Sequence, residues 1–332
     1  ASDFLDQDGY AQPRHEAFDA LQDAPETGFA LGLKQFLERI QMNGQGVGLD
    51  EVHHALERGE VVDTDDLGGA DVADDDGRGR FFAYDAESLE VIAVFDDLSL
   101  AAHGEGDPFL MLHGEPTWGY LYRRMIPPLA QIGRAVVPDM IGFGRSDKPV
   151  NDNEYSFKSH VRWMRAFVQA LDLKRITLIC QDWGGPIGLR VMADLHERFS
   201  RAVIMNTGLP DGSGFSPAFM AWRRFSQQSS ELDVAQLVRG TCRRKLTDDE
   251  AAAYGAPFPS VDYQAGALLF PRLVPIRLDH PGAYDNRVAI ETLKGLDLPA
   301  LPVFAEGDAI TRFAENAVRA MFKNAAPTVV IQ

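Results

Sequence analysis

The chain has 332 residues, of which 45% are hydrophobic, so it can bury a sizeable core in one large domain or in two unequal ones. No apolar run approaches the roughly 18 residues that cross a membrane, and the first residues lack the basic end and the apolar stretch of a signal peptide. We therefore expect a cytoplasmic protein without a membrane span, and its two cysteines, Cys180 and Cys242, are too few for a disulfide framework.

The net charge of −17 is concentrated in the first part of the chain. Residues 1–100 contain 24 acidic and 6 basic residues, whereas residues 101–332 contain 25 and 26. An acidic segment repels phosphate groups, so nucleic acid and anionic membranes are not expected as partners.

The first 80 residues are predicted to form an acidic helical leader and a linker. Apolar residues at helical spacing indicate one helix from Phe29 to Ile40 and a shorter one from Leu49 to Leu56. The acidic stretch 63–76 partly matches a calcium-binding loop, but Leu67 stands where an oxygen ligand is needed and no helical pattern follows. We interpret this stretch as a solvated linker and expect no metal site.

From residue 81 onward, apolar strands alternate with amphipathic helices, which is typical of the α/β class with a mostly parallel sheet covered on both faces. We assign residues 81–210 to the first part of this core and residues 296–332 to its last part. Pro, Gly and aromatic residues interrupt the alternation over 211–295, which predicts an inserted helical cap. Apolar stripes predict helices over 157–171 and 187–195, and the predicted strands are 81–84, 89–95, 98–102, 108–112, 134–138, 175–180, 202–206, 301–305 and 327–331.

One short segment carries most of the chemical information. The apolar run Ile176–Cys180 leads directly into Gln181-Asp182-Trp183-Gly184-Gly185. A strand followed by small-x-nucleophile-x-small at the start of a helix is the nucleophile elbow of α/β-hydrolases. The small positions are Cys180 and Gly184, and the nucleophile is Asp182.

An aspartate at this position favours substitution at a saturated carbon. A serine that displaced a leaving group from such a carbon would remain as an ether, whereas a carboxylate forms an alkyl ester that water can open. Alkyl halides and epoxides are the two substrate classes that fit this chemistry.

A second segment is predicted to supply an oxyanion hole. After the strand 108–112 comes His113-Gly114-Glu115-Pro116-Thr117-Trp118, at the loop where such folds present a backbone N–H group. Glu115 is expected to donate through its amide, not its carboxylate. The second N–H belongs to Trp183, the residue after the nucleophile.

Together these motifs resemble the haloalkane dehalogenases, in particular the subfamily with an HGEPTW loop and a QDWGG elbow. The resemblance runs from about residue 98 to 332. It implies an α/β-hydrolase fold with a helical cap. It also implies hydrolysis of a small haloalkane to an alcohol and a halide ion, in which Asp182 forms an alkyl ester that water then opens. Water is the only co-reactant, so no metal or organic cofactor is implied. Further matching segments are Val137-Pro138-Asp139, residues 142–149, Phe219-Met220-Ala221-Trp222 and residues 253–259.

The resemblance also assigns roles to individual residues. Trp183 and Trp222 match the tryptophans that hold the departing halide, a task that suits indole because it has one N–H donor and no acceptor. Asp308, after the strand 301–305, matches the acid that orients a catalytic histidine. Phe219, one helical turn before Trp222, is expected to line the substrate pocket.

The sequence departs from the family at its end. The family's histidine follows the final strand, whereas this sequence stops at Gln332 on that strand, and none of its eight histidines is an obvious replacement. We expect that the final loop and helix are missing from the sequence. The chain as given is then expected to be alkylated at Asp182 but to turn over poorly, and to be less stable.

Two other readings remain open from the sequence. An epoxide hydrolase shares the aspartate elbow and uses cap tyrosines, for which Tyr254 and Tyr263 are candidates. A catalytically degenerate binding protein would use the hydrolase fold as a scaffold and the acidic leader to dock a partner. An epoxide hydrolase has no use for a tryptophan that binds halide, and a scaffold has no reason to keep one. The presence of Trp222 therefore argues against both readings.

Overall fold

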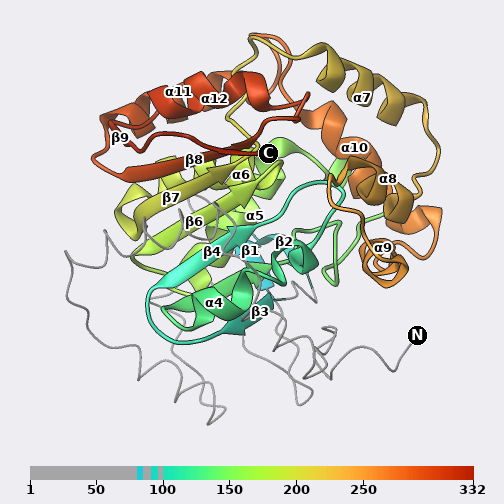
Figure 1. Ribbon diagram of the computed structural model, residues 1–332, viewed down its shortest axis with the longest axis horizontal. Coiled ribbons are helices and arrows are strands. Elements are labelled where there is room, and N and C mark those ends of the chain that lie inside the picture. Colours follow the sequence, from blue (N-terminus) through green and yellow to red (C-terminus); the bar gives the residue numbers. More distant parts are fainter. Residues whose placement is uncertain (1–80, 85–90, 96–99) are drawn as a thin grey trace. The chain divides into compact units, whose positions relative to one another are not determined.

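A computed structural model describes residues 81–84, 91–95 and 100–332 of the chain (Figure 1). The predicted leader helices and the acidic linker lie outside the described residues. Within the described part, no helix is long and apolar enough to cross a membrane. The predicted α/β class is confirmed, because a mostly parallel sheet is joined by helices that pack against it.

The main sheet has the strand order β10–β8–β7–β6–β4–β5–β3, with β9 beside β8. Neighbouring strands from β5 to β8 run parallel, and β3 is antiparallel to β5. A separate antiparallel pair is formed by β1 and β2. The strands are β1 (Phe81–Tyr84), β2 (Val91–Phe95), β3 (Leu100–His103), β4 (Pro108–Leu112), β5 (Arg134–Pro138), β6 (Ile176–Gln181), β7 (Phe199–Met205), β8 (Pro299–Ala305), β9 (Asn324–Ala325) and β10 (Val329–Ile331).

Most strand predictions are confirmed to within two residues. The largest difference is β7, which begins three residues before the prediction, at Phe199, and ends one residue before it, at Met205. Asn206 leaves the strand because its φ of +43° lies in the left-handed region. The region predicted as one final strand contains only the short β10, and β9 precedes it.

Helices of the core pack in layers against the sheet. The first residues of α5 are held by a capping box, in which the Ser156 side chain accepts from the Ser159 amide at 2.9 Å. Both α5 and α11 pack against α6, and α12 packs against β8. The core helices are α4 (Ile126–Ala130), α5 (Phe157–Ala170), α6 (Gly184–Asp194), α11 (Ala283–Gly295) and α12 (Glu315–Ala320), and short 3-10 helices cover 119–122, 152–154, 196–198, 261–263 and 312–314.

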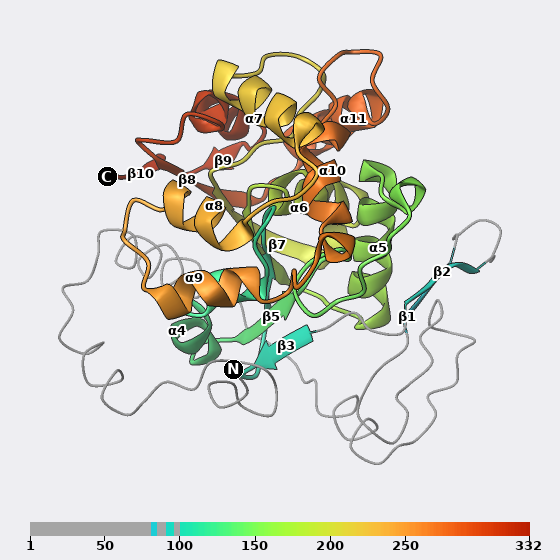
Figure 2. The same ribbon diagram turned by 90° about the vertical axis from the view of Figure 1, so that its right-hand side faces the viewer.

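Four further helices lie within the segment predicted as a cap. They are α7 (Pro217–Gln228), α8 (Val234–Thr241), α9 (Asp248–Gly255) and α10 (Ala265–Leu273), and they pack as the pairs α7–α10 and α8–α9. They are grouped at the right of Figure 1 and in the foreground of Figure 2. In contrast, α11 contacts α6, where Arg190 Nη1 donates to Asn286 Oδ1 at 2.9 Å. The cap boundaries 211–295 therefore stay a prediction.

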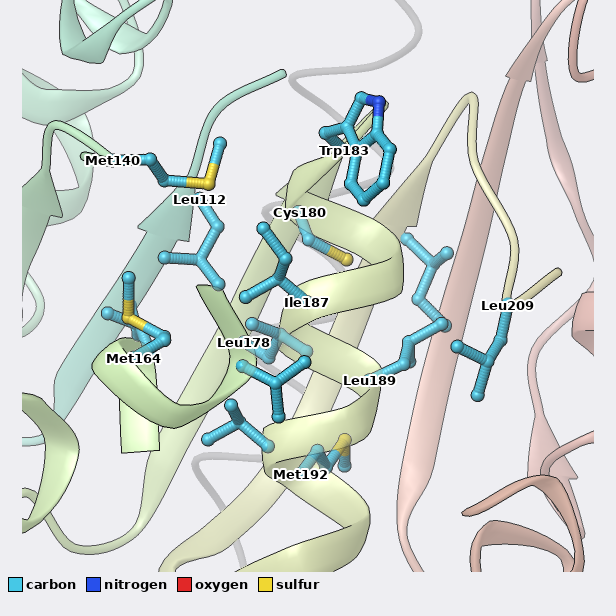
Figure 3. Close-up of a cluster of buried hydrophobic side chains, with 14 of the residues drawn as sticks. Leu112, Met140, Met164, Leu178, Cys180, Trp183, Ile187, Leu189, Met192 and Leu209 are labelled. Atoms are coloured by element: carbon cyan, nitrogen blue, oxygen red, sulfur yellow. The ribbon is translucent and has the colours of Figure 1, made fainter. Parts of the chain in front are cut away.

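The core is densest where α6 lies on β4 and β6. Every residue of β4 is buried, as are the first five residues of β6. Figure 3 shows Ile187 of α6 between Cys180, Leu178 and Leu112, with the Trp183 indole above them. A Cβ atom on Gly184 would lie 2.0 Å from the Leu112 carbonyl oxygen. Glycine at this position thus lets α6 begin directly against the end of β4.

Candidate active site

Asp182 occupies a sharp turn between β6 and α6. Its φ of +48° lies in the left-handed region, which non-glycine residues seldom adopt. Two donors hold its carbonyl oxygen, the Gly185 amide at 2.9 Å and the Thr207 hydroxyl at 2.6 Å. This turn lies between the end of β6 at Gln181 and the start of α6 at Gly184, which is the strand-to-helix position predicted from the sequence.

One of the two amides predicted as an oxyanion hole hydrogen bonds to the Asp182 carboxylate. The Glu115 N–H donates to Asp182 Oδ1 at 2.9 Å, and the Trp183 amide lies close enough to the carboxyl group to lower its pKa. Gly114 makes this approach possible, because a Cβ atom there would lie 2.3 Å from Asp182 Cβ. The two predicted motifs therefore meet at one carboxylate.

The environment of Asp182 changes its ionisation. Burial raises the pKa of its carboxyl group to about 6, the two backbone donors oppose this shift, and the Asp308 charge adds to it. The side chain is thus a partly desolvated carboxylate, which suits a nucleophile because fewer solvent hydrogen bonds must be broken before attack.

The two tryptophans come from different parts of the fold. The Trp183 side chain is 5% exposed and makes edge contacts with Phe270 and Phe157 at ring distances of 4.7 and 5.6 Å. Trp222 lies in α7 and stacks on Phe225, and it is near enough to the Glu115 carboxyl group to lower the pKa of that group. Trp183 follows Asp182 directly in the chain, and Trp222 is near Glu115, the residue whose amide binds the Asp182 carboxylate.

The other predicted site residues have contrasting surroundings. Phe219 is buried and packs against Phe215 at a ring distance of 5.2 Å, so its role in a substrate pocket stays a prediction. Asp308 follows β8, where its carboxylate accepts from the amides of Ile310 and Thr311 at 2.8 and 2.9 Å and from the Thr311 hydroxyl. It is close enough to Asp182 to influence its pKa.

Two histidines of the core are bound to backbone groups. His113 accepts from the Met140 amide through Nε2 at 2.9 Å and contacts the Gly114 carbonyl through Nδ1 at 3.0 Å. His160 lies between the carbonyl oxygens of Ser156 and Ile141, and burial lowers its pKa to about 4. Both arrangements are structural.

Sequence reasoning missed two contributors to the site. No sequence motif marks Thr207. It follows β7, which runs parallel to β6, so its side chain can reach the turn at Asp182 that follows β6. The sequence analysis assigned a role only to the Glu115 amide, whereas the Glu115 carboxyl group is also buried, and its Oε1 atom has no hydrogen-bond partner among the described residues. Burial and the nearby Asp182 charge raise the pKa of Glu115 well above its usual value, against the lowering effect of Trp222.

Metal ligands are not gathered in the part of the chain that the structure describes. No three His, Cys, Asp or Glu side chains there lie close enough together to hold an ion.

The sheet and the helices that cover it define the chain as an α/β-hydrolase. The sequence profile of the alpha/beta hydrolase fold matches residues 107–250. A haloalkane dehalogenase from Mycobacterium marinum is 45% identical over 214 residues, which are 64% of this chain and 72% of that protein. One from Psychrobacter cryohalolentis is 44% identical over 209 residues, or 62% and 69% of the two chains. The chain belongs to the haloalkane dehalogenase family.

Solved structures agree with this assignment. The tetrameric structure of a haloalkane dehalogenase from Paraglaciecola agarilytica has a TM-score of 0.67 and 33% sequence identity, and the match covers 80% of this chain and 92% of that one. A putative ancestral haloalkane dehalogenase has a TM-score of 0.62 at 28% identity, with 70% and 87% covered.

Proposed function

We propose that the protein catalyses hydrolytic dehalogenation of a haloalkane and that Asp182 is the nucleophile. A carboxylate oxygen forms a bond to the halogen-bearing carbon while the carbon–halogen bond breaks, and the electron pair leaves with the halide. Water then adds to the carboxyl carbon of the resulting ester and releases the alcohol, with one proton per turnover. Membership of the family supports the reaction class.

The observation that carries the proposal is the Glu115 amide bound to the Asp182 carboxylate at 2.9 Å. This amide donates to the group that would become an ester, so it is placed to stabilise an oxygen that gains negative charge when water attacks. Placed before the reaction, the donor needs no reorganisation in the transition state.

The indoles of Trp183 and Trp222 are proposed to receive the halide. An ion leaving in surroundings of low polarity needs hydrogen-bond donors, because an unpaired buried charge costs several kcal/mol. Trp183 is buried beside the nucleophile and Trp222 reaches the adjoining Glu115 carboxyl group. Asp308 is proposed to orient the base for the second step, and Phe219 to line the substrate pocket.

The epoxide hydrolase alternative would need a tyrosine hydroxyl group near Asp182. The Tyr254 hydroxyl accepts a hydrogen bond from Arg123 Nη1 at 3.1 Å, and the Tyr263 side chain is 46% exposed. These surroundings favour structural roles for both tyrosines, so dehalogenation remains the proposal.

Alkylation of the protein by a bromoalkane tests the nucleophile directly. We expect intact-mass spectrometry to show one alkyl group per chain, with the adduct in the peptide that contains Asp182 and one bromide released. Asp182→Asn should abolish both signals, whereas Asp262→Asn, at an exposed position, should not change them. Bromide release from Asp182→Asn at the wild-type rate, or an adduct elsewhere, would disprove the proposal. Alcohol formation reports the second step separately.

A further inference from the structure

Trp118 joins the oxyanion loop to α9, a helix of the predicted cap. Its indole N–H donates to the carbonyl oxygen of Ala253 in α9 at 3.1 Å, and the residue is 5% exposed. In a continued helix this carbonyl group would accept from the residue four positions further on, which is Pro257 and has no N–H group. The Trp118 indole thus supplies a donor that Pro257 cannot.

Tyr120 and Arg123 extend this contact along α9. The Tyr120 ring stacks on the Trp118 indole at a centroid distance of 5.5 Å and meets the Tyr254 ring edge-on at 5.2 Å. Arg123 donates from Nη1 to the Tyr254 hydroxyl at 3.1 Å and from Nη2 to Glu250 Oε1 at 2.9 Å. Glu250 and Tyr254 are four residues apart and therefore lie on the same face of α9. We call the contacts of Trp118, Tyr120 and Arg123 with this helix the loop–α9 contact.

The loop held in this way carries the amide that binds the candidate nucleophile. Glu115 lies three residues before Trp118, and its N–H donates to Asp182 Oδ1 at 2.9 Å. Between them, the Thr117 amide donates to the Gly114 carbonyl oxygen at 2.9 Å and closes a tight turn. A displacement of Trp118 is therefore passed to Glu115 through a short, hydrogen-bonded segment.

We propose that Trp118 is a positioning residue for the nucleophile, and that its hydrogen bond to Ala253 uses α9 to keep the Glu115 amide on the Asp182 carboxylate. This inference rests on the function proposed above. Trp118 acts through Glu115 and not on the reacting atoms. Loss of its N–H should release the loop and raise the pKa of Asp182, because the Glu115 donor favours the ionised form of that group.

The substitution Trp118→Phe leaves the titratable groups near Asp182 in place. The Asp308 charge raises the pKa of Asp182. Burial raises the pKa of three further groups nearby, which are Glu115, Tyr122 and Cys180. All of these groups are present in the wild type and in the variant, so a difference between the two proteins reports the position of the loop.

Alkylation by a bromoalkane from pH 5 to 9, followed by timed intact-mass spectrometry, tests the proposal. Trp118→Phe keeps a ring beside Tyr120 and removes the N–H group. We expect the midpoint of its pH–rate profile to lie about half a unit to one unit above the wild-type midpoint, since ionised Asp182 loses a donor. We also expect faster hydrogen exchange in the peptide 113–118. Trp163→Phe removes an indole N–H from α5 and should keep the wild-type midpoint and exchange.

A second variant replaces Trp118→Phe in this test if that protein does not fold. Glu250→Gln removes the charge that binds Arg123 and leaves the Trp118 indole unchanged, so it should raise the midpoint by a smaller amount. Glu231→Gln removes a charge at an exposed position and should match the wild type. An unchanged midpoint in the folded variant overturns the inference while wild-type Asp182 is still alkylated. Absence of alkylation in the wild type at every pH overturns the proposed function, and the inference with it.

Discussion

The hydroxyl group of Thr207, just after β7, donates a hydrogen bond of 2.6 Å to the backbone carbonyl oxygen of Asp182, at the end of β6. Asp182 has a strained φ of +48°, and such a conformation costs of order 1–3 kcal/mol unless its surroundings hold it. Thr207 is 2% exposed, so water does not replace this donor readily. The contact ties the candidate nucleophile to the neighbouring strand.

Replacing Thr207 by valine keeps the shape of the side chain and removes the donor. We expect the free energy of unfolding to fall by about 1–2 kcal/mol, because a buried carbonyl group loses a hydrogen bond, and alkylation at Asp182 to slow by about tenfold as the elbow relaxes. Urea denaturation and timed mass spectrometry measure the two effects. Thr207→Ser retains the hydroxyl group and serves as the control. Equal loss in both variants would mean that the methyl group matters, not the hydrogen bond.

Gly114 tests how closely the oxyanion loop must approach the nucleophile. A Cβ atom at this position would lie 2.3 Å from Asp182 Cβ and 2.6 Å from Oδ1, so Gly114→Ala must displace one of the two segments. We expect alkylation to fall by about a hundredfold, because a carboxylate displaced by about 1 Å is no longer aligned with the carbon that it attacks. Gly240→Ala is the matched control, since a Cβ atom there meets nothing within 4 Å. Normal alkylation by Gly114→Ala would show that the close approach is dispensable.

The pH dependence of alkylation follows from the ionisation of Asp182. Only the carboxylate is nucleophilic, and burial raises its pKa to about 6. We expect the single-turnover rate constant to rise about tenfold per pH unit below pH 6 and to level off about one unit above it. A rate constant that stays constant from pH 5 to 8 would contradict a raised pKa at this residue.

Asp182 should also affect stability in the direction opposite to that of a salt-bridged carboxylate. Its folded-state pKa of about 6 exceeds the ordinary value of 3.8, so the folded protein binds the proton more tightly than the unfolded chain does. The resulting stability is fully present below about pH 4 and is lost as pH rises through about 6. Asp182→Asn should therefore be more stable than the wild type at pH 8 by about 1–3 kcal/mol, and this advantage should disappear near pH 4. Urea denaturation at both pH values measures the difference.

Removing either of the two proposed halide donors, the indole N–H groups of Trp183 and Trp222, should slow alkylation more than it lowers the free energy of unfolding. Phenylalanine at position 183 or 222 keeps most of the aromatic surface and removes the N–H. We expect each substitution to slow alkylation by about 10–100-fold, because the departing ion loses one hydrogen bond in the transition state. Trp163→Phe, in α5 away from the elbow, is the control. Stopped-flow bromide release gives the rates, and equal rates in all three variants would remove the indoles from the mechanism.

Strand positions and the elbow could be predicted because they depend on neighbouring residues. Short, nearly continuous apolar runs mark β4 and β6, and the small residues around Asp182 permit a tight turn directly after the strand. The helix α11 was not predicted as a separate element, and its packing partner could not be predicted either. Asn286 of α11 pairs with Arg190 of α6, although it was assigned to the cap because composition changes near residue 211.

By itself, the sequence determined the class of fold and pointed to Asp182 as the candidate nucleophile, because short-range sterics and hydrophobic periodicity depend on consecutive residues. Only the tertiary structure decided that the Thr207 hydroxyl and the Glu115 amide both hydrogen bond to Asp182. Those contacts join segments far apart in the chain, and their existence depends on how strands and helices pack. The ionisation of Asp182 and Glu115 belongs to the same category, because burial and neighbouring charge arise only when the chain has folded.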